Sequence, residues 1–149
     1  MIKTANVFIV EDDKFLSPLL RSRLEKEGLT VLQAFDGEEA LRALETTRPQ
    51  VIIMDLIMPR VSGLELLEML SSDPQYNQIP VIIMSNLSQE SDVEKAKRLG
   101  AVGYFVKVNA SLDEVIKLVK QLMAKAGPAT PAAAPTATPA PPAEGPMRL

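Results

Sequence analysis

Several polar side chains stand directly after short apolar runs of the chain, and their types suit metal or phosphoryl chemistry. In chain order they are Glu11-Asp12-Asp13, Asp55, Ser85-Asn86 and Lys107. If the acids share one site, two carboxylates about 5 Å apart repel by roughly 3 kcal/mol, so the site needs a cation. The chain has no histidine and no cysteine. Oxygen ligands therefore predict a hard ion, Mg²⁺ with Mn²⁺ as the alternative.

The same residue types suit phosphoryl transfer. A carboxylate such as Asp55 can act as a nucleophile and form an acyl phosphate. The developing charge then needs a metal ion, an ammonium such as Lys107 and a hydroxyl such as Ser85. Each residue alone has an ordinary structural explanation, as a helix-start acid, a turn aspartate, a strand-end hydroxyl or a solvated lysine. Their joint occurrence, each at the end of a different apolar run, favours a shared site.

The apolar runs themselves read as strands. They occupy 6–10, 30–35, 51–54, 81–84 and 102–106. Their β-branched and aromatic content is typical of strands, and most are continuously apolar, as in a sheet covered on both faces. Parallel strands of such a sheet end at one edge, where α/β proteins bind their ligands.

Helical patterns separate the runs. The first is an apolar stripe of Phe15, Leu16, Leu19, Leu20 and Leu24 that stops before Gly28. Asp36 and Glu39 open the second, Ser62 and Glu65 the third, and Ser111 and Glu114 the last, each with the spacing of a helix N-terminus. A polar helix is expected over about 88–99. This alternation predicts an α/β fold with a parallel sheet between helices.

Composition bounds the remaining possibilities. The chain has 149 residues and a net charge of -3, which predicts one main domain and gives no electrostatic case for binding nucleic acid or a membrane surface. Absence of cysteine, of a long apolar run and of a signal peptide pattern favours the cytoplasm. We expect a folded domain at 1–126. Residues 127–149 hold seven of the twelve prolines, which predicts a disordered Pro/Ala-rich tail.

Four motifs together resemble the receiver (CheY-like) domain of two-component response regulators. They are "FIVEDD", "VIIMDLIMPRVSG", "PVIIMSN" and "GYFVK", in the family's order and approximate spacing over residues 5–124. The resemblance implies a flavodoxin-like, doubly wound sheet of five parallel strands in the order 2-1-3-4-5 with five helices. It also implies a stand-alone signalling switch, mainly a regulatory phosphoprotein, that catalyses its own phosphoryl transfer and slow hydrolysis.

The resemblance assigns roles to the site. A sensor histidine kinase or a phosphotransfer protein would phosphorylate Asp55. Asp12 and Asp55 would bind Mg²⁺ directly, Glu11 mainly through water, and Ile57 through its backbone carbonyl. Lys107 would pair with the phosphoryl group.

The resemblance also implies an output. Ser85 would hydrogen-bond the phosphoryl group, and Tyr104 would be the aromatic switch that turns inward as Ser85 moves. The readout face would be the fourth helix, fifth strand and fifth helix, which would control a downstream protein target or form a phosphorylation-linked homodimer.

Three departures from the family pattern carry expectations. Val108 follows Lys107 where the family often has a cis-proline, which predicts a trans peptide bond here. Asn86 replaces a very small residue and is expected either to narrow access to Asp55 or to change how the switch moves. Ile57 and Leu87 are apolar beside the path of the hydrolytic water, which predicts slow loss of the phosphoryl group.

Two other functions remain open. The first is a receiver-fold scaffold or interaction module that is not phosphorylated, against which the complete set of acids, serine and lysine argues. The second is a phosphatase of the haloacid dehalogenase type, which is disfavoured because Ile57 stands where such enzymes have a second aspartate.

Overall fold

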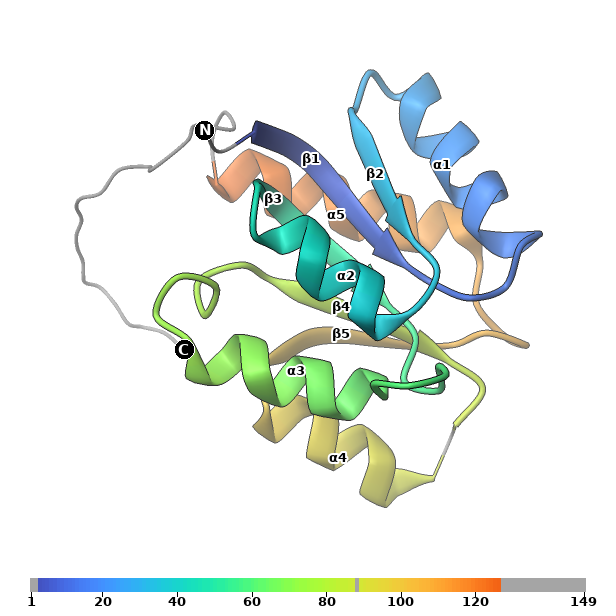
Figure 1. Ribbon diagram of the computed structural model, residues 1–149. Coiled ribbons are helices and arrows are strands. Elements are labelled where there is room, and N and C mark those ends of the chain that lie inside the picture. Colours follow the sequence, from blue (N-terminus) through green and yellow to red (C-terminus); the bar gives the residue numbers. More distant parts are fainter. Residues whose placement is uncertain (1–2, 88, 127–149) are drawn as a thin grey trace.

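The chain folds into five parallel strands that alternate with five helices. A computed structural model describes residues 3–87 and 89–126, and the tail predicted at 127–149 lies outside the described residues (Figure 1). The elements are β1 (Lys3–Val10), α1 (Leu16–Lys26), β2 (Val31–Ala34), α2 (Gly37–Leu44), β3 (Thr47–Met54), α3 (Gly63–Ser72), β4 (Val81–Ser85), α4 (Glu90–Arg98), β5 (Ala101–Val106) and α5 (Leu112–Ala126). The strand order β2-β1-β3-β4-β5 confirms the predicted doubly wound fold.

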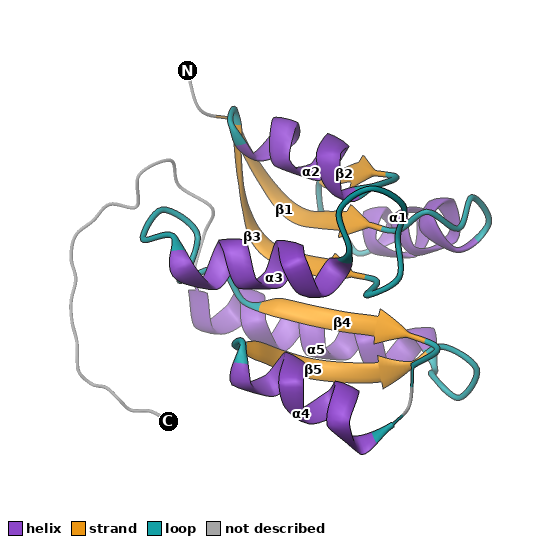
Figure 2. Ribbon diagram, turned by 60° about the horizontal axis from the view of Figure 1, so that its bottom comes forward, coloured by secondary structure: helices purple, strands orange, loops and turns teal. Residues whose placement is uncertain are grey.

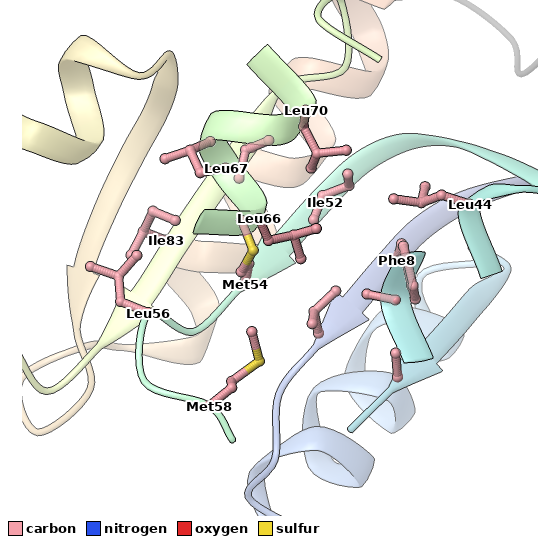
Figure 3. Packing of buried hydrophobic residues seen from close by; sticks show 14 of the residues in the cluster. Phe8, Leu44, Ile52, Met54, Leu56, Met58, Leu66, Leu67, Leu70 and Ile83 are labelled. Atoms are coloured by element: carbon pink, nitrogen blue, oxygen red, sulfur yellow. The ribbon is translucent and has the colours of Figure 1, made fainter. Parts of the chain in front are cut away.

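Helices cover the sheet on both faces. One buried cluster joins the strands to α2, α3 and α4, and a second joins them to α1 and α5; Figure 2 shows these layers. Successive strand residues point to opposite faces, so Phe8 belongs to the first cluster and Ile9 to the second. Figure 3 shows the first cluster, where Met54 lies near Leu66 of α3. This two-sided burial explains why the strand sequences are continuously apolar.

The apolar stripe predicted for the first helix is partly wrong. Phe15 is 90% exposed and Leu19 is 50% exposed, whereas Leu20 and Leu24 are buried. The carboxylate of Asp13 accepts hydrogen bonds from the backbone N–H groups of Phe15 and Leu16, at 2.8 and 3.0 Å. This cap starts the helix after Phe15, and the face that α1 turns to the core then excludes Leu19.

Strand β3 begins earlier than its apolar run. It includes Pro49, which pairs with Ala5 of β1, and proline is normally excluded from the interior of a sheet because it lacks an N–H donor. The other neighbour, β4, joins β3 only from Ile52 onward. At Pro49 the strand is therefore an edge strand, where proline is tolerated.

Two predicted helix starts are present in the structure. The Asp36 side chain accepts from the Glu39 N–H at 2.8 Å, and Ser62 with Glu65 forms a reciprocal capping box at the start of α3. Each pair satisfies backbone donors that the first helical turn leaves unpaired. Within the described residues, every helix is too short or too polar to cross a membrane.

The loop from β3 to α3 folds back tightly on itself. The Gly63 N–H donates to the Leu56 carbonyl at 2.8 Å. A Cβ atom at Gly63 would overlap the carbonyl of Asp55, and it would lie 2.5 Å from the Cα of Leu56. Only glycine allows the start of α3 to approach the end of β3 this closely.

We expect Gly63→Ala to destabilise the fold by about 2–4 kcal/mol, because the backbone of the loop must shift to admit a methyl group. The measurement is urea unfolding followed by circular dichroism. Gly28→Ala is the control, since Gly28 has a φ of +84° but nothing within 4 Å of the added Cβ. Its cost is the left-handed backbone alone, about 1 kcal/mol. Equal losses in both variants would contradict the close approach at Gly63.

Candidate functional site

Three charged residues of the site stand one position beyond a strand, and each is held by a backbone hydrogen bond that prolongs the parallel ladder. The bonds run from the N–H of Glu11 to the Ala34 carbonyl (3.0 Å), from Asp55 to Val10 (3.0 Å) and from Lys107 to Ser85 (2.9 Å). The residues therefore share one edge of the sheet, as the sequence predicted. Their backbones are as fixed as the strands that precede them.

The side chains meet at this edge. Carboxylate oxygens of Glu11, Asp12 and Asp55 lie within 4.8 Å of one another. The Lys107 Nζ is 2.8 Å from Glu11 Oε1 and 2.8 Å from Asp55 Oδ2. Glu11 and Asp55 are buried, whereas Asp12 is exposed. The site thus opens to solvent on the side of Asp12.

Burial changes the ionisation of Glu11. Burial is the largest influence on this carboxyl and raises the pKa of Glu11 to about 7. The hydrogen bond from Lys107 opposes this effect, whereas the charge of Asp55 adds to it. For Lys107, burial by itself lowers the pKa, but the hydrogen bonds to Asp55 and Glu11 outweigh it and raise the pKa. The lysine therefore stays an ammonium.

The donor set suits a divalent cation. When all three carboxylates are ionised, Lys107 balances only one of them. The uncompensated carboxylate oxygens are hard ligands, which Mg²⁺ and Mn²⁺ prefer. Burial is the main cause of the raised pKa of Glu11, and the nearby charge of Asp55 adds to it. The residues present therefore fit the metal that the sequence predicted.

Ser85 and Tyr104 lie on neighbouring strands beside the acids. Ser85 is fully buried, and its Oγ accepts from the Leu87 N–H at 3.2 Å. The Tyr104 hydroxyl donates to the Leu87 carbonyl at 2.6 Å. Burial and, after it, the charge of Asp92 raise the pKa of Tyr104, and the Ser85 side chain partly opposes them. The β4–α4 loop is thereby tied to both predicted switch residues.

The structure describes two further features that the sequence singled out, Ile57 and the Lys107–Val108 peptide bond. The Ile57 N–H donates to Asp55 Oδ1 at 3.2 Å, and the Ile57 side chain is 58% exposed. The metal-binding role of its carbonyl stays a prediction. Among the described residues no peptide bond is cis, which confirms a trans Lys107–Val108 bond.

Asp13 has the helix-start role that the sequence offered for these acids, and its backbone also contacts Glu11. The Asp13 N–H donates to Glu11 Oε2 at 3.1 Å, while the Asp13 carboxylate caps α1. Hydrogen bonds from the N–H groups of Leu16 and Phe15 lower the pKa of Asp13. The signal was present, since a third acid after the pair stands where a helix N-terminus favours negative charge.

The comparison with known proteins identifies the family of the chain. The family model of the response regulator receiver domain matches residues 7–120, and the chain belongs to this family. The order of the four motifs along the chain predicted this family, and the match covers nearly all of the described residues.

Individual relatives agree. The chain is 35% identical over 122 residues to the phosphate regulon transcriptional regulatory protein PhoB of Rhizobium meliloti, covering 82% of this chain and 53% of PhoB. It is 32% identical over 121 residues to the polar-differentiation response regulator DivK of Brucella anthropi, covering 81% of this chain and 98% of DivK. The chain spans about half the length of relatives such as PhoB.

A solved structure has the same fold. The receiver domain of the Francisella response regulator 1452 superimposes with a TM-score of 0.76 at 32% identity, covering 83% of this chain and 99% of that domain. The fold, the family and the clustered acids therefore support one another.

The raised pKa of Glu11 predicts that Mg²⁺ binding strengthens with pH. Below pH 7 most Glu11 is protonated, and the cation must displace that proton, so affinity rises by up to about tenfold from pH 6 to pH 8. Isothermal titration calorimetry at the two pH values measures this change. Glu11→Gln should flatten the profile. A tenfold change that persists in Glu11→Gln would assign the proton to another group.

Proposed function

We propose that this chain is a phosphorylation-dependent signalling switch whose phosphoacceptor is Asp55. The observation that carries the proposal is the contact of the buried Asp55 carboxylate with the Lys107 ammonium at 2.8 Å, beside the acid pair Glu11 and Asp12. A structural ion pair has no need of a second buried carboxylate, Glu11, since this raises the cost of burying charge.

The reaction is the transfer of a phosphoryl group from a phosphohistidine of a sensor histidine kinase or phosphotransfer protein. An oxygen of Asp55 attacks phosphorus, the P–N bond breaks, and the imidazole nitrogen keeps the electron pair and takes a proton from solvent. Lys107 pairs with the new phosphoryl oxygens, and Ser85 donates a hydrogen bond to them. These groups stabilise charge that exists only after transfer begins.

Mg²⁺, with Mn²⁺ as the alternative, is the proposed cofactor. Asp12, Asp55 and the Ile57 carbonyl would hold it, with Glu11 acting through water. Bound there, the ion supplies positive charge that neutralises the phosphoryl oxygens.

The output is a change of the α4–β5–α5 face in the cytoplasm. The Tyr104 hydroxyl donates a hydrogen bond to the Leu87 carbonyl. The N–H of the same residue, Leu87, donates to the Ser85 hydroxyl oxygen. Movement of Ser85 toward a phosphoryl group alters this arrangement, and the face then controls a downstream protein or a second copy of the chain. Some relatives, such as PhoB, are longer than this chain. The proposal includes the case in which the face controls a further part of such a longer protein.

Incubation with a small phosphodonor and Mg²⁺ should add one phosphoryl group, measured by intact mass. Asp55→Asn should add none, because the amide is a poor nucleophile and cannot form the acyl phosphate. Omission of Mg²⁺ should abolish the gain in the native protein. Asp113→Asn, an exposed carboxylate of α5, should behave as the native chain.

No gain of mass would be followed by beryllofluoride titration. Binding of beryllofluoride without phosphorylation would mean that access to Asp55 beside Asn86 is restricted to a protein donor. Failure of both would contradict the switch and leave an interaction module of the receiver fold.

The apolar side chains of Ile57 and Leu87 should make the phosphorylated form long-lived. Ile57 is exposed and Leu87 partly buried, and neither can hydrogen-bond an attacking water. The rate of mass loss after removal of the donor measures the lifetime. Ile57→Asn, which keeps the backbone carbonyl, should shorten it several-fold. Complete loss within seconds in the native chain would refute this expectation.

A further inference from the structure

Arg60 has an unusual backbone conformation close to the site. It is the one non-glycine of the described residues with positive φ, at 69°. It lies in the β3–α3 loop, which begins at Asp55 and includes Ile57. Side chains with a Cβ atom are strained in this conformation, so surrounding contacts must hold it.

The Arg60 side chain provides such a contact. Its Nη1 donates to Asp36 Oδ2 at 2.8 Å. Asp36 is largely buried, with a side chain 19% exposed against 57% for Arg60, and its other oxygen accepts from the Glu39 N–H. The loop is thus tied to a carboxylate that is itself fixed as the N-cap of α2.

The backbone at the start of α2 also packs against the β3–α3 loop. A Cβ atom at Gly37 would lie 2.5 Å from the Val61 carbonyl oxygen, so α2 begins directly against the residue after Arg60. On the other side, the Lys14 ammonium lies 5.9 Å from the centre of the Phe35 ring. Residues 35–37, which contain no predicted site residue, therefore touch both loops that carry the acids.

The loop has a second anchor on its inner side. Leu56 and Met58 are buried in the cluster that packs on α3 (Figure 3). Ile57 lies between them with its side chain exposed. The segment that supplies Asp55 and the Ile57 carbonyl is thus held from the core by apolar packing and from outside by Arg60.

We infer that Arg60 and Asp36 are positioning residues for the metal site, an inference that rests on the proposed function. Their ion pair holds the left-handed turn, and that turn sets where the Ile57 carbonyl lies relative to Asp12 and Asp55. Neither residue is a metal ligand. Partners that orient ligands affect metal affinity although they do not touch the ion.

Charge and position predict opposite effects for one substitution. Arg60→Gly removes a positive charge from the neighbourhood of three carboxylates, which by Coulomb attraction alone strengthens Mg²⁺ binding. Glycine adopts positive φ without strain, so the turn loses its ion pair but not its allowed backbone. A positioning role predicts weaker Mg²⁺ binding with little change in thermal stability.

The experiment measures Mg²⁺ affinity by calorimetry and thermal unfolding of the full chain. The variants are Arg60→Gly, Asp36→Asn, which keeps an N-cap oxygen for Glu39, and the double variant. Arg42→Gln is the control, because it removes a positive charge from α2 where the side chain pairs with exposed Glu38. We expect each single variant to weaken binding about threefold or more, the double variant to weaken it no further, and Arg42→Gln not to weaken it.

Unchanged or stronger binding in Arg60→Gly would overturn the inference, and so would additive losses in the double variant. If the native chain binds no Mg²⁺, the proposed function fails and the inference with it. If the native chain binds Mg²⁺ and Arg60→Gly binds it equally well, the positioning role of Arg60 is wrong but the proposed function stands. Should Arg60→Gly unfold, Asp36→Asn is compared with Glu38→Gln, which removes a negative charge from an exposed side chain of the same helix start; equal losses in the two variants would then overturn the inference.

Discussion

The site depends on the Lys107 ammonium lying between two buried carboxylates. Glu11 and Asp55 are almost fully removed from water, and each has an oxygen 2.8 Å from the same Nζ. Without that cation the two acids would repel in a medium that screens charge poorly. Burial, with a smaller contribution from the charge of Asp55, raises the pKa of Glu11 to about 7 although Lys107 donates a hydrogen bond to it. With Asp12 beside them, three carboxylates face one lysine, and their oxygens are of the kind that hard cations prefer.

The backbone makes this arrangement affordable, because the ladder rather than the side chains fixes the charges. Glu11, Asp55 and Lys107 each donate their N–H to the last carbonyl of a neighbouring strand. Ordering the backbone of these three residues therefore costs little conformational entropy beyond that of forming the sheet. The two apolar clusters stabilise the sheet. Loops then refine the site. Gly63 folds the β3–α3 loop against its own start, and the corner at Asp36 touches it from the other side.

The sequence predicted the strands, the helices and which charged residues meet at the edge of the sheet, because these signals are local. Asp55 and Lys107 each follow an apolar run directly, and Ser62 with Glu65 has capping-box spacing. Other features were missed because their causes lie far away in the chain. Phe15 is apolar yet exposed, since Asp13 starts the helix after it. Pro49 belongs to β3 because β4 has not yet joined that strand.

The sequence by itself determined the order of the elements, the continuous apolar strands and the chemical types at their ends, since these follow from residue periodicity and position. The tertiary structure alone decided that Lys107 contacts both Glu11 and Asp55, that the pKa of Glu11 is raised and that Arg60 reaches Asp36. These contacts join residues far apart in the chain. Their energies depend on distance and on exclusion of water, and both quantities exist only once the sheet and its loops have assembled.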